Sequence, residues 1–588
     1  MADTRKQLNP EQVLASASSA DALPDSRGSN LFLADPGFAP LLALYLEPKL
    51  HAHLMPHLER LGALAGGALD ELAATADRHP PVLHHRSRAG EDRQWIEKHP
   101  AYRRLEEIAF GEYGLAAMSH RGGVLGWPAP LPPVVKYALT YVYVQAEFGV
   151  CCPLSMTDSL TRTLRKYGEP GLVAQFLPAL TSQDLDTLAQ GAMFMTEQGA
   201  GSDVGATVTR AVRAGEHWLL TGDKWFCSNA DAALAMVLAR PQGAPPGTKG
   251  LALFLLPRTL ADGTPNRYRI VRLKDKLGTR DMPSGEIRLE GAVAFLVGDA
   301  ARGFVQMTDM INMSRLSNGM RAAGMMRRAL TEALFIARRR VAFGKTLIEM
   351  PLMRRQLLKL MLAAEAARSV MLYTATELAK ADAGDDAARL RVRLLTPLLK
   401  FRACRDARRA TGDAMEVRGG SGYIEEWSDA RLVRDAHLGS IWEGTSNIVA
   451  LDAMRAIRRK GALEVLVPAL QSLLPPNKLG KALGEALARA AEFAREADET
   501  DARQAATGLY YAAAATVLAG EGARMSARGD ARRLLLAALT YQQRLQPRDP
   551  LAPSQPVLES ALCGALLAEA PVKPEHAAGI LRDLPLAE

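Results

Sequence analysis

The 588-residue chain has few cysteines, few aromatic residues and no long apolar run. No segment approaches the roughly 18 apolar residues that a membrane-spanning helix needs, so we expect no membrane partner. The five cysteines show no C-x-x-C spacing, which favours reduced thiols in a cytoplasmic protein over a zinc site. Residues 1–30 are polar, without the apolar centre of a signal peptide, and we expect a disordered tail there.

Positive charge is concentrated in one part of the chain. Residues 321–460 hold 27 Lys and Arg against 16 Asp and Glu, a net charge of +11. The whole chain has a net charge of +8, and residues 461–588 are nearly neutral. Such an excess can attract CoA phosphates, dinucleotides or nucleic acid. A solvated arginine-rich helical surface explains any single cluster equally well.

Hydrophobic periodicity divides the chain into four blocks after the tail. Apolar residues at a spacing of three and four predict helices over 31–188, 301–460 and 461–588, whereas 189–300 carries several short strand patterns typical of a small β-barrel. The fold class is therefore mainly α with a central β-domain. Within 217–229 we expect two strands joined by a turn at 221–223. We also expect one helix to stop at Gly344 and another to begin at Pro351.

Two glycine- or aromatic-containing stretches could face a ligand. The first, "MTEQGAGSD" (195–203), leaves an open backbone whose N–H groups can approach a planar or anionic group, although a plain turn fits equally. The second, "KWFCSNA" (224–230), places aromatic rings beside hydroxyl and amide groups, which suits a flat heteroaromatic ring or simply a strand end.

Two further stretches could bind a pyrophosphate. "RRRVAFGK" (338–345) and "EVRGGSGYIEEW" (416–427) combine arginines and glycines at helix ends. Helix C-caps with solvated arginines are the simpler interpretation of each.

The stretch "SIWEGTSNIVALDAMR" (440–455) places one carboxylate, Glu443, between an aromatic ring and a Gly-Thr-Ser turn. A carboxylate in such a position has either a partner or a chemical role. The structural alternative is that Glu443 caps the helix that follows.

In this order the stretches resemble the acyl-CoA dehydrogenase family of flavoproteins, and most of all its AidB-type branch, the DNA alkylation response flavoproteins. Features that carry the branch resemblance include "SNLFLADPG", "KWFCS", "RLKDKLGTRDMPSGEI", "PLMRRQ" and "SIWEGTSNIVALDAMR". The resemblance implies an N-terminal helical domain (31–188), a middle β-barrel (189–300), a C-terminal four-helix bundle (301–460) and an additional C-terminal helical domain (461–588). It also implies FAD and a homotetramer whose subunits share each FAD site.

The resemblance assigns positions to the cofactor. The sequence departs from the family pattern at Gln198, where proline is common, and at Pro351, where a glutamine helps hold FAD. The positions implied to bind FAD are Met195, Thr196, Gly201, Ser202, Phe226, Cys227, Ser228, Arg340, Phe343, Gly419, Gly420, Ile441, Trp442, Gly444, Ser446 and Asn447.

Glu443 matches the catalytic base of the family, which removes the α-proton of an acyl-CoA thioester before hydride transfer to flavin N5. A carboxylate needs a raised pKa in a dry site for this task. Some members place the base just before the Arg of the helix after the barrel, but that position here is Ser314. An oxidase-like activity is a variant of this dehydrogenase hypothesis. A nitroalkane-oxidising relative is less favoured, because that chemistry prefers Asp at position 443.

The AidB-type branch suggests an alternative function, namely binding double-stranded DNA with weak or vestigial dehydrogenation. Arginines three and four apart share a helix face and could meet a phosphate backbone, and Arg455, Arg458, Arg459 and Lys460 have this spacing. A solvated helix, or a contact with CoA or another subunit, explains the same residues. The acyl group and the electron acceptor do not follow from the sequence.

If Arg455 contacts DNA, Arg455→Glu should weaken duplex binding while leaving the flavin spectrum intact, because it reverses a charge beside the phosphate backbone. Duplex affinity measured across a salt series checks this. An affinity that is unchanged and insensitive to salt would remove Arg455 from the interface.

Overall fold

The computed structural model describes residues 23–547, 551 and 556–582. Its first block is helical, with a small two-stranded hairpin that the periodicity did not predict. Most of the expected tail, residues 1–22, lies outside the described residues, while Ser26 is buried and donates to Glu332. The elements of this block are α2 (Phe38–Leu42), α3 (Pro48–Gly66), α4 (Ala68–Arg78), β1 (Val82–His84), β2 (Trp95–Glu97), α5 (Pro100–Glu106), η2 (Glu107–Glu112), η3 (Val124–Gly126), α6 (Pro133–Tyr143), α7 (Cys151–Tyr167) and α8 (Pro170–Leu180).

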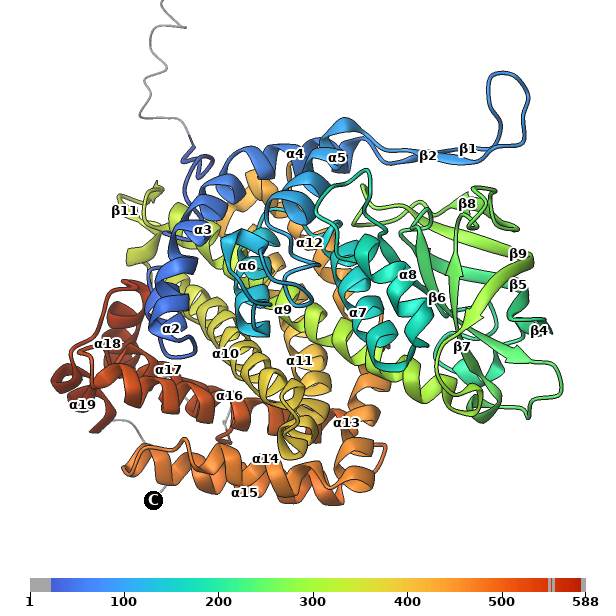
Figure 1. Ribbon diagram of the computed structural model, residues 1–588. Coiled ribbons are helices and arrows are strands. Elements are labelled where there is room, and N and C mark those ends of the chain that lie inside the picture. Colours follow the sequence, from blue (N-terminus) through green and yellow to red (C-terminus); the bar gives the residue numbers. More distant parts are fainter. Residues whose placement is uncertain (1–22, 548–550, 552–555, 583–588) are drawn as a thin grey trace, which may run out of the picture.

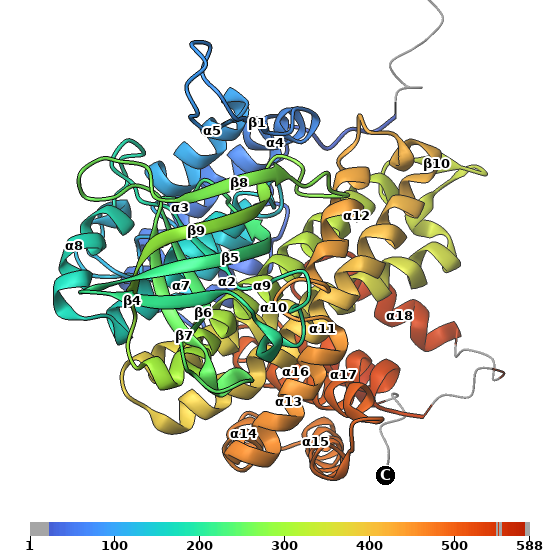
Figure 2. The same ribbon diagram turned by 90° about the vertical axis from the view of Figure 1, so that its right-hand side faces the viewer.

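The second block is the predicted β-barrel, which Figure 2 shows facing the viewer. Its strands follow the order β3-β6-β4-β5-β9-β7, with β8 on β9, and a β6–β7 pairing closes the sheet. The apolar run 251–256 lies in a fully buried strand, as predicted. The strands are β3 (Gly191–Phe194), β4 (Arg210–Ala214), β5 (His217–Ser228), β6 (Leu234–Pro241), β7 (Ala252–Pro257), β8 (Tyr268–Leu273) and β9 (Ser284–Leu296); the short helices η4 (Val204–Ala206), η5 (Thr248–Gly250) and η6 (Ala300–Arg302) lie between or after them.

The predicted turn at 221–223 is wrong. Strand β5 runs unbroken from His217 to Ser228, and Gly222 lies within it, in register with Leu289 of β9 and packed against Thr209. The register against β9 shifts at two places, between Leu220 and Thr221 and between Lys224 and Cys227. At the first, the extra residue is Gly291 of β9, with a φ of +79°, so the bulge glycine belongs to the partner strand. Closing a small barrel bends its long strands, and a bulge with glycine permits the bend.

The third block is a bundle of long helices running through the middle of the molecule (Figure 1). Pro351 opens α10 as predicted, but the preceding helix ends at Ala337 and not at Gly344. Gly344, with a φ of +74°, instead turns the hairpin β10–β11. The elements are α9 (Gly303–Ala337), β10 (Val341–Ala342), β11 (Lys345–Thr346), η7 (Leu347–Glu349), α10 (Pro351–Asp382), α11 (Asp386–Arg418), η8 (Gly419–Tyr423), α12 (Ser428–Gly439) and α13 (Ser446–Lys460).

The fourth block is helical, as predicted, and lies along one side of the bundle, drawn in orange and red in Figure 1. Its helix α16 packs against α10, α11 and α13. The helices are α14 (Ala462–Gln471), α15 (Lys478–Glu496), α16 (Ala502–Ser526), α17 (Arg532–Arg544), α18 (Pro556–Leu567) and α19 (Pro574–Arg582). Within the described residues, none of the helices combines the length and apolar character that crossing a membrane requires.

A buried network of charges joins this added block to the bundle. Glu365 of α10 accepts from Arg368 of its own helix and lies 2.9 Å from Arg533 of α17. Arg533 also pairs with Glu521 of α16 at 2.7 Å, and Arg368 pairs with Asp35 near the start of the described chain. All five side chains are almost fully buried. Burial opposes ionisation of Glu365, but the surrounding arginines outweigh it and hold its pKa well below the ordinary value.

Removing the charge of Glu365 should therefore destabilise the fold. Glu365→Gln leaves the buried guanidinium groups with too little counter-charge, and we expect it to lower the free energy of unfolding by about 3–5 kcal/mol. Urea denaturation followed by circular dichroism measures this. The exposed pair Arg389–Asp386 supplies the control, since Arg389→Gln should change stability by less than about 1 kcal/mol. Equal midpoints for the two variants would contradict the role given to Glu365.

Candidate active site

Glu443 lies in the turn between α12 and α13, where the backbone adopts an unusual conformation. Its φ is +56°, which is rare outside glycine, and Gly444 follows with a φ of +97°. Two cations from the bundle hold this turn. Arg315 of α9 donates through Nε to the Glu443 carbonyl oxygen at 3.0 Å, and Lys400 of α11 donates to the Gly444 carbonyl oxygen. The turn is thus fixed by contacts from two different helices.

Asp452, two turns into α13, orients the cation that holds Glu443. Its two carboxylate oxygens accept from Arg315 and from Arg393, each at 2.7 Å. Burial opposes the charge of Asp452, but the two guanidinium groups outweigh it and lower its pKa. The pair Arg315–Asp452 therefore fixes where the Glu443 turn sits on the bundle.

The Glu443 carboxylate itself lacks such support. Its Oε2 is buried and accepts no hydrogen bond from any described residue. Burial raises the pKa of Glu443 above its ordinary value, although the Ser314 hydroxyl and the charges of Arg315, Lys400 and Arg321 act against the rise. A buried carboxyl group with a raised pKa and a free oxygen is poised to exchange a proton with a ligand.

Trp442 forms an aromatic wall beside this carboxylate. Its ring stacks on Phe148 with centroids 5.8 Å apart, and the guanidinium of Arg321 lies 4.8 Å from the Trp442 ring centroid. The indole Nε1 is buried and has no hydrogen-bond partner among the described residues. Buried indole N–H groups normally have one, so this donor is available to a ligand.

The end of strand β5 faces the same region. After the register shift between Lys224 and Cys227, Cys227 points into the barrel core, while its neighbours Phe226 and Ser228 lie on the other face. The Phe226 ring is 60% exposed. Burial raises the pKa of the Cys152 thiol on α7 to about 11, and Ser228, Arg321 and Glu443 also act on it, which places the strand end beside the bundle.

The glycine-rich loop 195–203 is anchored at one end and open at the other. Glu197 accepts from Lys224 at 2.8 Å in a buried ion pair, and the Thr196 carbonyl oxygen accepts from the Trp225 N–H at 2.8 Å. Met195 is half-buried. Gly201 and Ser202 are exposed, with an uncrowded backbone. The sequence did not reveal the Glu197–Lys224 pair that positions this loop.

The remaining residues of the Glu443 turn are near the surface. Ile441 is exposed, Ser446 accepts from Arg405 at 3.4 Å, and Asn447 accepts from Arg503 at 3.5 Å. These arginines come from α11 and α16, so the added C-terminal block reaches the turn.

The other predicted cofactor residues lie at the opposite end of the molecule. Arg340 donates to the Arg418 carbonyl oxygen at 2.8 Å and lies beside Gly419, and Gly420 is exposed. Phe343 is 96% exposed at a φ of +54°. Figures 1 and 2 place the β10–β11 hairpin far from the barrel. Within one chain the two halves of the predicted FAD site are not brought together.

The predicted nucleic-acid residues Arg455, Arg458, Arg459 and Lys460 are all exposed at the C-terminal end of α13. The structure thus places them on a surface, away from the Glu443 carboxylate.

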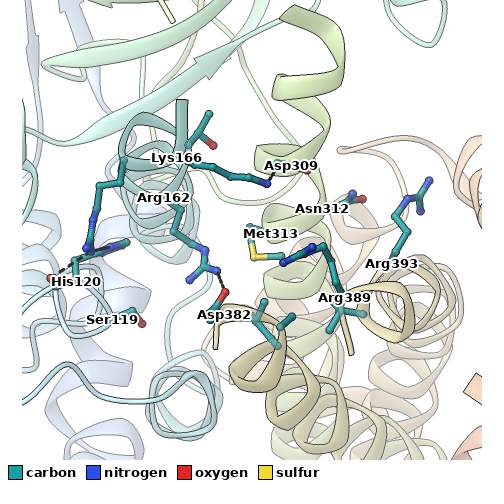
Figure 3. A pocket seen from close by; sticks show the side chains of 15 residues that line it. Ser119, His120, Arg162, Lys166, Asp309, Asn312, Met313, Asp382, Arg389 and Arg393 are labelled. Atoms are coloured by element: carbon teal, nitrogen blue, oxygen red, sulfur yellow. Dashed lines mark hydrogen bonds and ion pairs between the residues drawn. The ribbon is translucent and has the colours of Figure 1, made fainter. Parts of the chain in front are cut away.

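A pocket of about 570 Å³ opens next to Arg315 (Figure 3). It lies between α7, α9 and the adjoining ends of α10 and α11, and Asn312 on its wall accepts from Arg315 at 3.4 Å. Lys166 pairs with Asp309 at 2.5 Å, and Arg162 pairs with Asp382. The cations on the wall outnumber the carboxylates by five to two: Arg162, Arg165, Lys166, Arg389 and Arg393 against Asp309 and Asp382.

The residues present fit a flat flavin ring. The exposed Phe226 ring and the free Trp442 Nε1 offer an aromatic surface and a donor, and the open backbone at Gly201 and Ser202 can approach polar ring atoms or a pyrophosphate. All of them lie where the barrel meets the bundle.

Sequence reasoning missed several buried cations of the site, namely Arg321, Lys400 and Lys276. Burial lowers the pKa of Lys400 and of Lys276 to about 8. The available signal was weak: Arg321 interrupts the small and apolar residues of "LSNGMRAAGMM", where an exposed face would also show an occasional charge.

A β-barrel between helical blocks, with a buried carboxylate and an aromatic wall at the junction, defines the flavin-dependent dehydrogenase class. Three family descriptions match in order: "Adaptive response protein AidB N-terminal domain" over 22–187, "Acyl-CoA dehydrogenase, middle domain" over 192–292 and "Acyl-CoA dehydrogenase, C-terminal domain" over 301–458. The chain belongs to the acyl-CoA dehydrogenase family, with an AidB-like N-terminal domain, and is an FAD-dependent oxidoreductase.

Relatives align over most of the chain. It is 31% identical to acyl-CoA dehydrogenase family member 11 of Caenorhabditis elegans, over 73% of this chain and 71% of the relative. It is 33% identical to the putative acyl-CoA dehydrogenase AidB of Escherichia coli K12, over 67% and 72% respectively. The crystal structure of C. elegans ACDH-11 in complex with C11-CoA superposes with a TM-score of 0.81 and 26% identity, covering 92% of this chain and 96% of that chain.

The orienting role of Asp452 can be tested by Asp452→Asn. Losing the carboxylate frees Arg315, so the Glu443 turn should shift and flavin reduction should slow by about 10–100-fold while FAD stays bound. Stopped-flow absorbance measures the reduction. Glu464→Gln, in an exposed pair on α14, serves as the control. A parent-like rate in Asp452→Asn would show that Arg315 holds the turn unaided.

Proposed function

We propose that this protein removes two hydrogens from the α and β carbons of an acyl-CoA thioester, with Glu443 as the base. The observation that carries the proposal is the Glu443 carboxylate, which has a raised pKa and a buried oxygen, Oε2, without a partner among the described residues. The acyl-CoA ligand of the C. elegans relative supports this substrate class.

In the proposed reaction Glu443 takes the α-proton, and the electron pair left at Cα forms the Cα=Cβ bond as a hydride departs from Cβ. Bound FAD supplies the acceptor for that hydride. The products are the enoyl thioester, the reduced cofactor and a protonated Glu443. Trp442 and Phe148 keep water from the carboxylate, which preserves its basicity toward a carbon acid.

The thioester oxygen gains negative charge as the α-proton leaves and needs a donor. The backbone N–H of Glu443 donates to no carbonyl or side chain among the described residues. Because Arg315 and Lys400 fix the turn, this N–H is held in place before the substrate arrives.

The basic pocket beside Arg315 is the proposed entrance for CoA. Five cations line it, and Arg389 and Arg393 also pair with carboxylates outside the wall, Asp386 and Asp452. Arg165 has no carboxylate partner among the described residues, and this basic lining suits the phosphate groups of CoA. Asn312 links the wall to the Arg315–Glu443 contact. Sequence reasoning did not predict this pocket.

A homotetramer is the proposed assembly. The β10–β11 hairpin, which follows Arg340 and contains Phe343 in its turn, lies far from strand β5, which carries Phe226, so a single FAD can meet both sets only across an interface. The exposed apolar residues Phe343, Tyr423 and Leu352 at that end are suitable for burial against another subunit. For this homotetramer we also propose a cytoplasmic location.

A second candidate function is binding to double-stranded DNA in the response to alkylation. It is favoured by the four exposed cations at the end of α13, from Arg455 to Lys460, and by the AidB-like N-terminal domain. In this case dehydrogenation would be weak or vestigial.

Replacing the base provides the direct test. Glu443→Gln should retain FAD but slow flavin reduction by an acyl-CoA at least about 1,000-fold, because an amide cannot accept the α-proton. Anaerobic titration with short, branched and long acyl-CoAs, followed by flavin absorbance, gives the rates. Reduction as fast as in the parent would refute the role of Glu443.

The pH dependence has a definite sign. Since the carboxylate form is active and its folded pKa is raised, reduction by the parent should speed up as pH rises through that pKa and then level off. The midpoint should lie above about 4.3, the value for an unperturbed glutamate. A rate that falls with rising pH over the same window would contradict a basic role.

A further inference from the structure

One face of α9 presents polar atoms without partners beside Glu443. Ser314, Asn318 and Arg321 follow one another at intervals of four and three residues, so they share a face of the helix. Both amide atoms of Asn318 and Arg321 Nη1 are buried and have no hydrogen-bond partner among the described residues. Buried polar groups are normally satisfied, so several on one face indicate a missing ligand.

Arg321 is the unusual member of this face. It is 1% exposed yet forms no ion pair with any carboxylate that the structure describes. Its Nε donates to the Ser317 carbonyl oxygen at 3.2 Å and its Nη2 to Ser155 Oγ at 3.4 Å, which leaves Nη1 free. Other buried arginines of the bundle, such as Arg327 and Arg368, have carboxylate partners.

The aromatic rings around Arg321 explain part of its burial but not all of it. The guanidinium lies 4.8 Å from the Trp442 ring centroid and 5.5 Å from that of Phe148. Such contacts stabilise a desolvated cation. The cost of burying an ion without a counter-charge exceeds that stabilisation. A counter-charge is therefore still required.

The surroundings of Arg321 are polar away from the rings as well. Ser155 and Ser317, which accept from Arg321, line a cavity of about 20 Å³ that also touches Lys136 and Asp158. Lys136 and Asp158 are paired at 2.7 Å, so neither serves Arg321. A long alkyl chain directed along this face would leave these buried donors unsatisfied, which is unfavourable.

We propose that the acyl group of the natural thioester ends in a carboxylate, which is bound by Arg321 and the side-chain amide of Asn318. The inference rests on the proposed dehydrogenase function and names its substrate class, a CoA monothioester of a short dicarboxylic acid. The carboxylate supplies the counter-charge that Arg321 lacks, and Asn318 Nδ2 donates to it. The thioester end then lies at Ser314 and Glu443, one to two helical turns away along α9.

The test compares thioesters that differ only in the terminal group. Glutaryl-CoA and pentanoyl-CoA have the same number of acyl carbons, as do adipyl-CoA and hexanoyl-CoA. Dissociation constants are measured by calorimetry on the FAD-loaded Glu443→Gln variant, which should bind without turnover, and flavin reduction is measured separately on the parent. We expect binding of the carboxylate member to be at least about 100-fold tighter, since a site with buried donors rejects analogues that cannot satisfy them.

Variants at two positions locate the preference. Arg321→Met removes the charge with a side chain of similar length and should abolish the preference for the carboxylate member of each pair. Asn318→Leu leaves the charge of Arg321 in place but removes the amide donor, and it should weaken glutaryl-CoA binding about tenfold. Glu464→Gln, far from α9, should behave as the parent. Thermal midpoints and FAD content confirm that each variant is folded.

The outcomes separate this inference from the proposed function. If pentanoyl-CoA reduces the flavin and binds as tightly as glutaryl-CoA, the carboxylate site is overturned and the dehydrogenase stands. If glutaryl-CoA binds in an Arg321-dependent way but no thioester reduces the flavin, the site is upheld and dehydrogenation is overturned. If neither thioester binds, both are overturned.

Discussion

Pairing buried guanidinium groups with carboxylates is the constraint on which this structure depends. Arginine does not lose its charge at neutral pH, so each arginine that the bundle buries needs a fixed acceptor. Arg368 and Arg533 share Glu365, and through Asp35 and Glu521 they tie the start of the described chain and the added C-terminal helices to α10. The long central helices can be straight and rich in arginine because other parts of the chain bring the acceptors.

The candidate active site follows the same rule and departs from it at two points. Arg315 and Arg393 share Asp452, and this pairing fixes the turn that carries Glu443. Glu443 has a free carboxylate oxygen, and Arg321 has no carboxylate within ion-pair distance among the described residues. Exceptions to a rule that the rest of the core obeys occur where a ligand completes the pairing. The free carboxylate suits proton transfer, and the unpaired guanidinium suits recognition of an anion.

Much of the fold could be predicted from local pattern. The barrel and the start of α10 at Pro351 follow from periodicity and from proline, which act over a few residues.

The predictions were wrong where packing between distant parts of the chain determines the local structure. The sequence around Gly222 is typical of a turn, but pairing with β9 keeps Gly222 inside β5, in register with Leu289. Gly344 reads as a helix stop, yet α9 ends earlier and the glycine turns a hairpin. In the site, Glu443 and Trp442 could be singled out from one motif, whereas the role of Cys227 could not. An extra residue of β5 between Lys224 and Cys227, opposite β9, breaks the strand alternation and directs the Cys227 side chain into the barrel core.

The sequence by itself determined the family, the order of the blocks and the position of the one carboxylate in the Trp-Glu-Gly turn, because these depend on contiguous residues. Only the tertiary structure decided which charges are paired. Arg315, Arg321 and Arg327 occupy one helix at spacings of six residues, and nothing in their local sequence distinguishes them. One pairs with Asp452, one pairs with Glu569, and one contacts aromatic rings, a hydroxyl group and a backbone carbonyl but no carboxylate among the described residues. The partners are supplied by α13 and by the end of the chain, more than 130 residues away, so long-range folding determines which arginine remains available to a ligand.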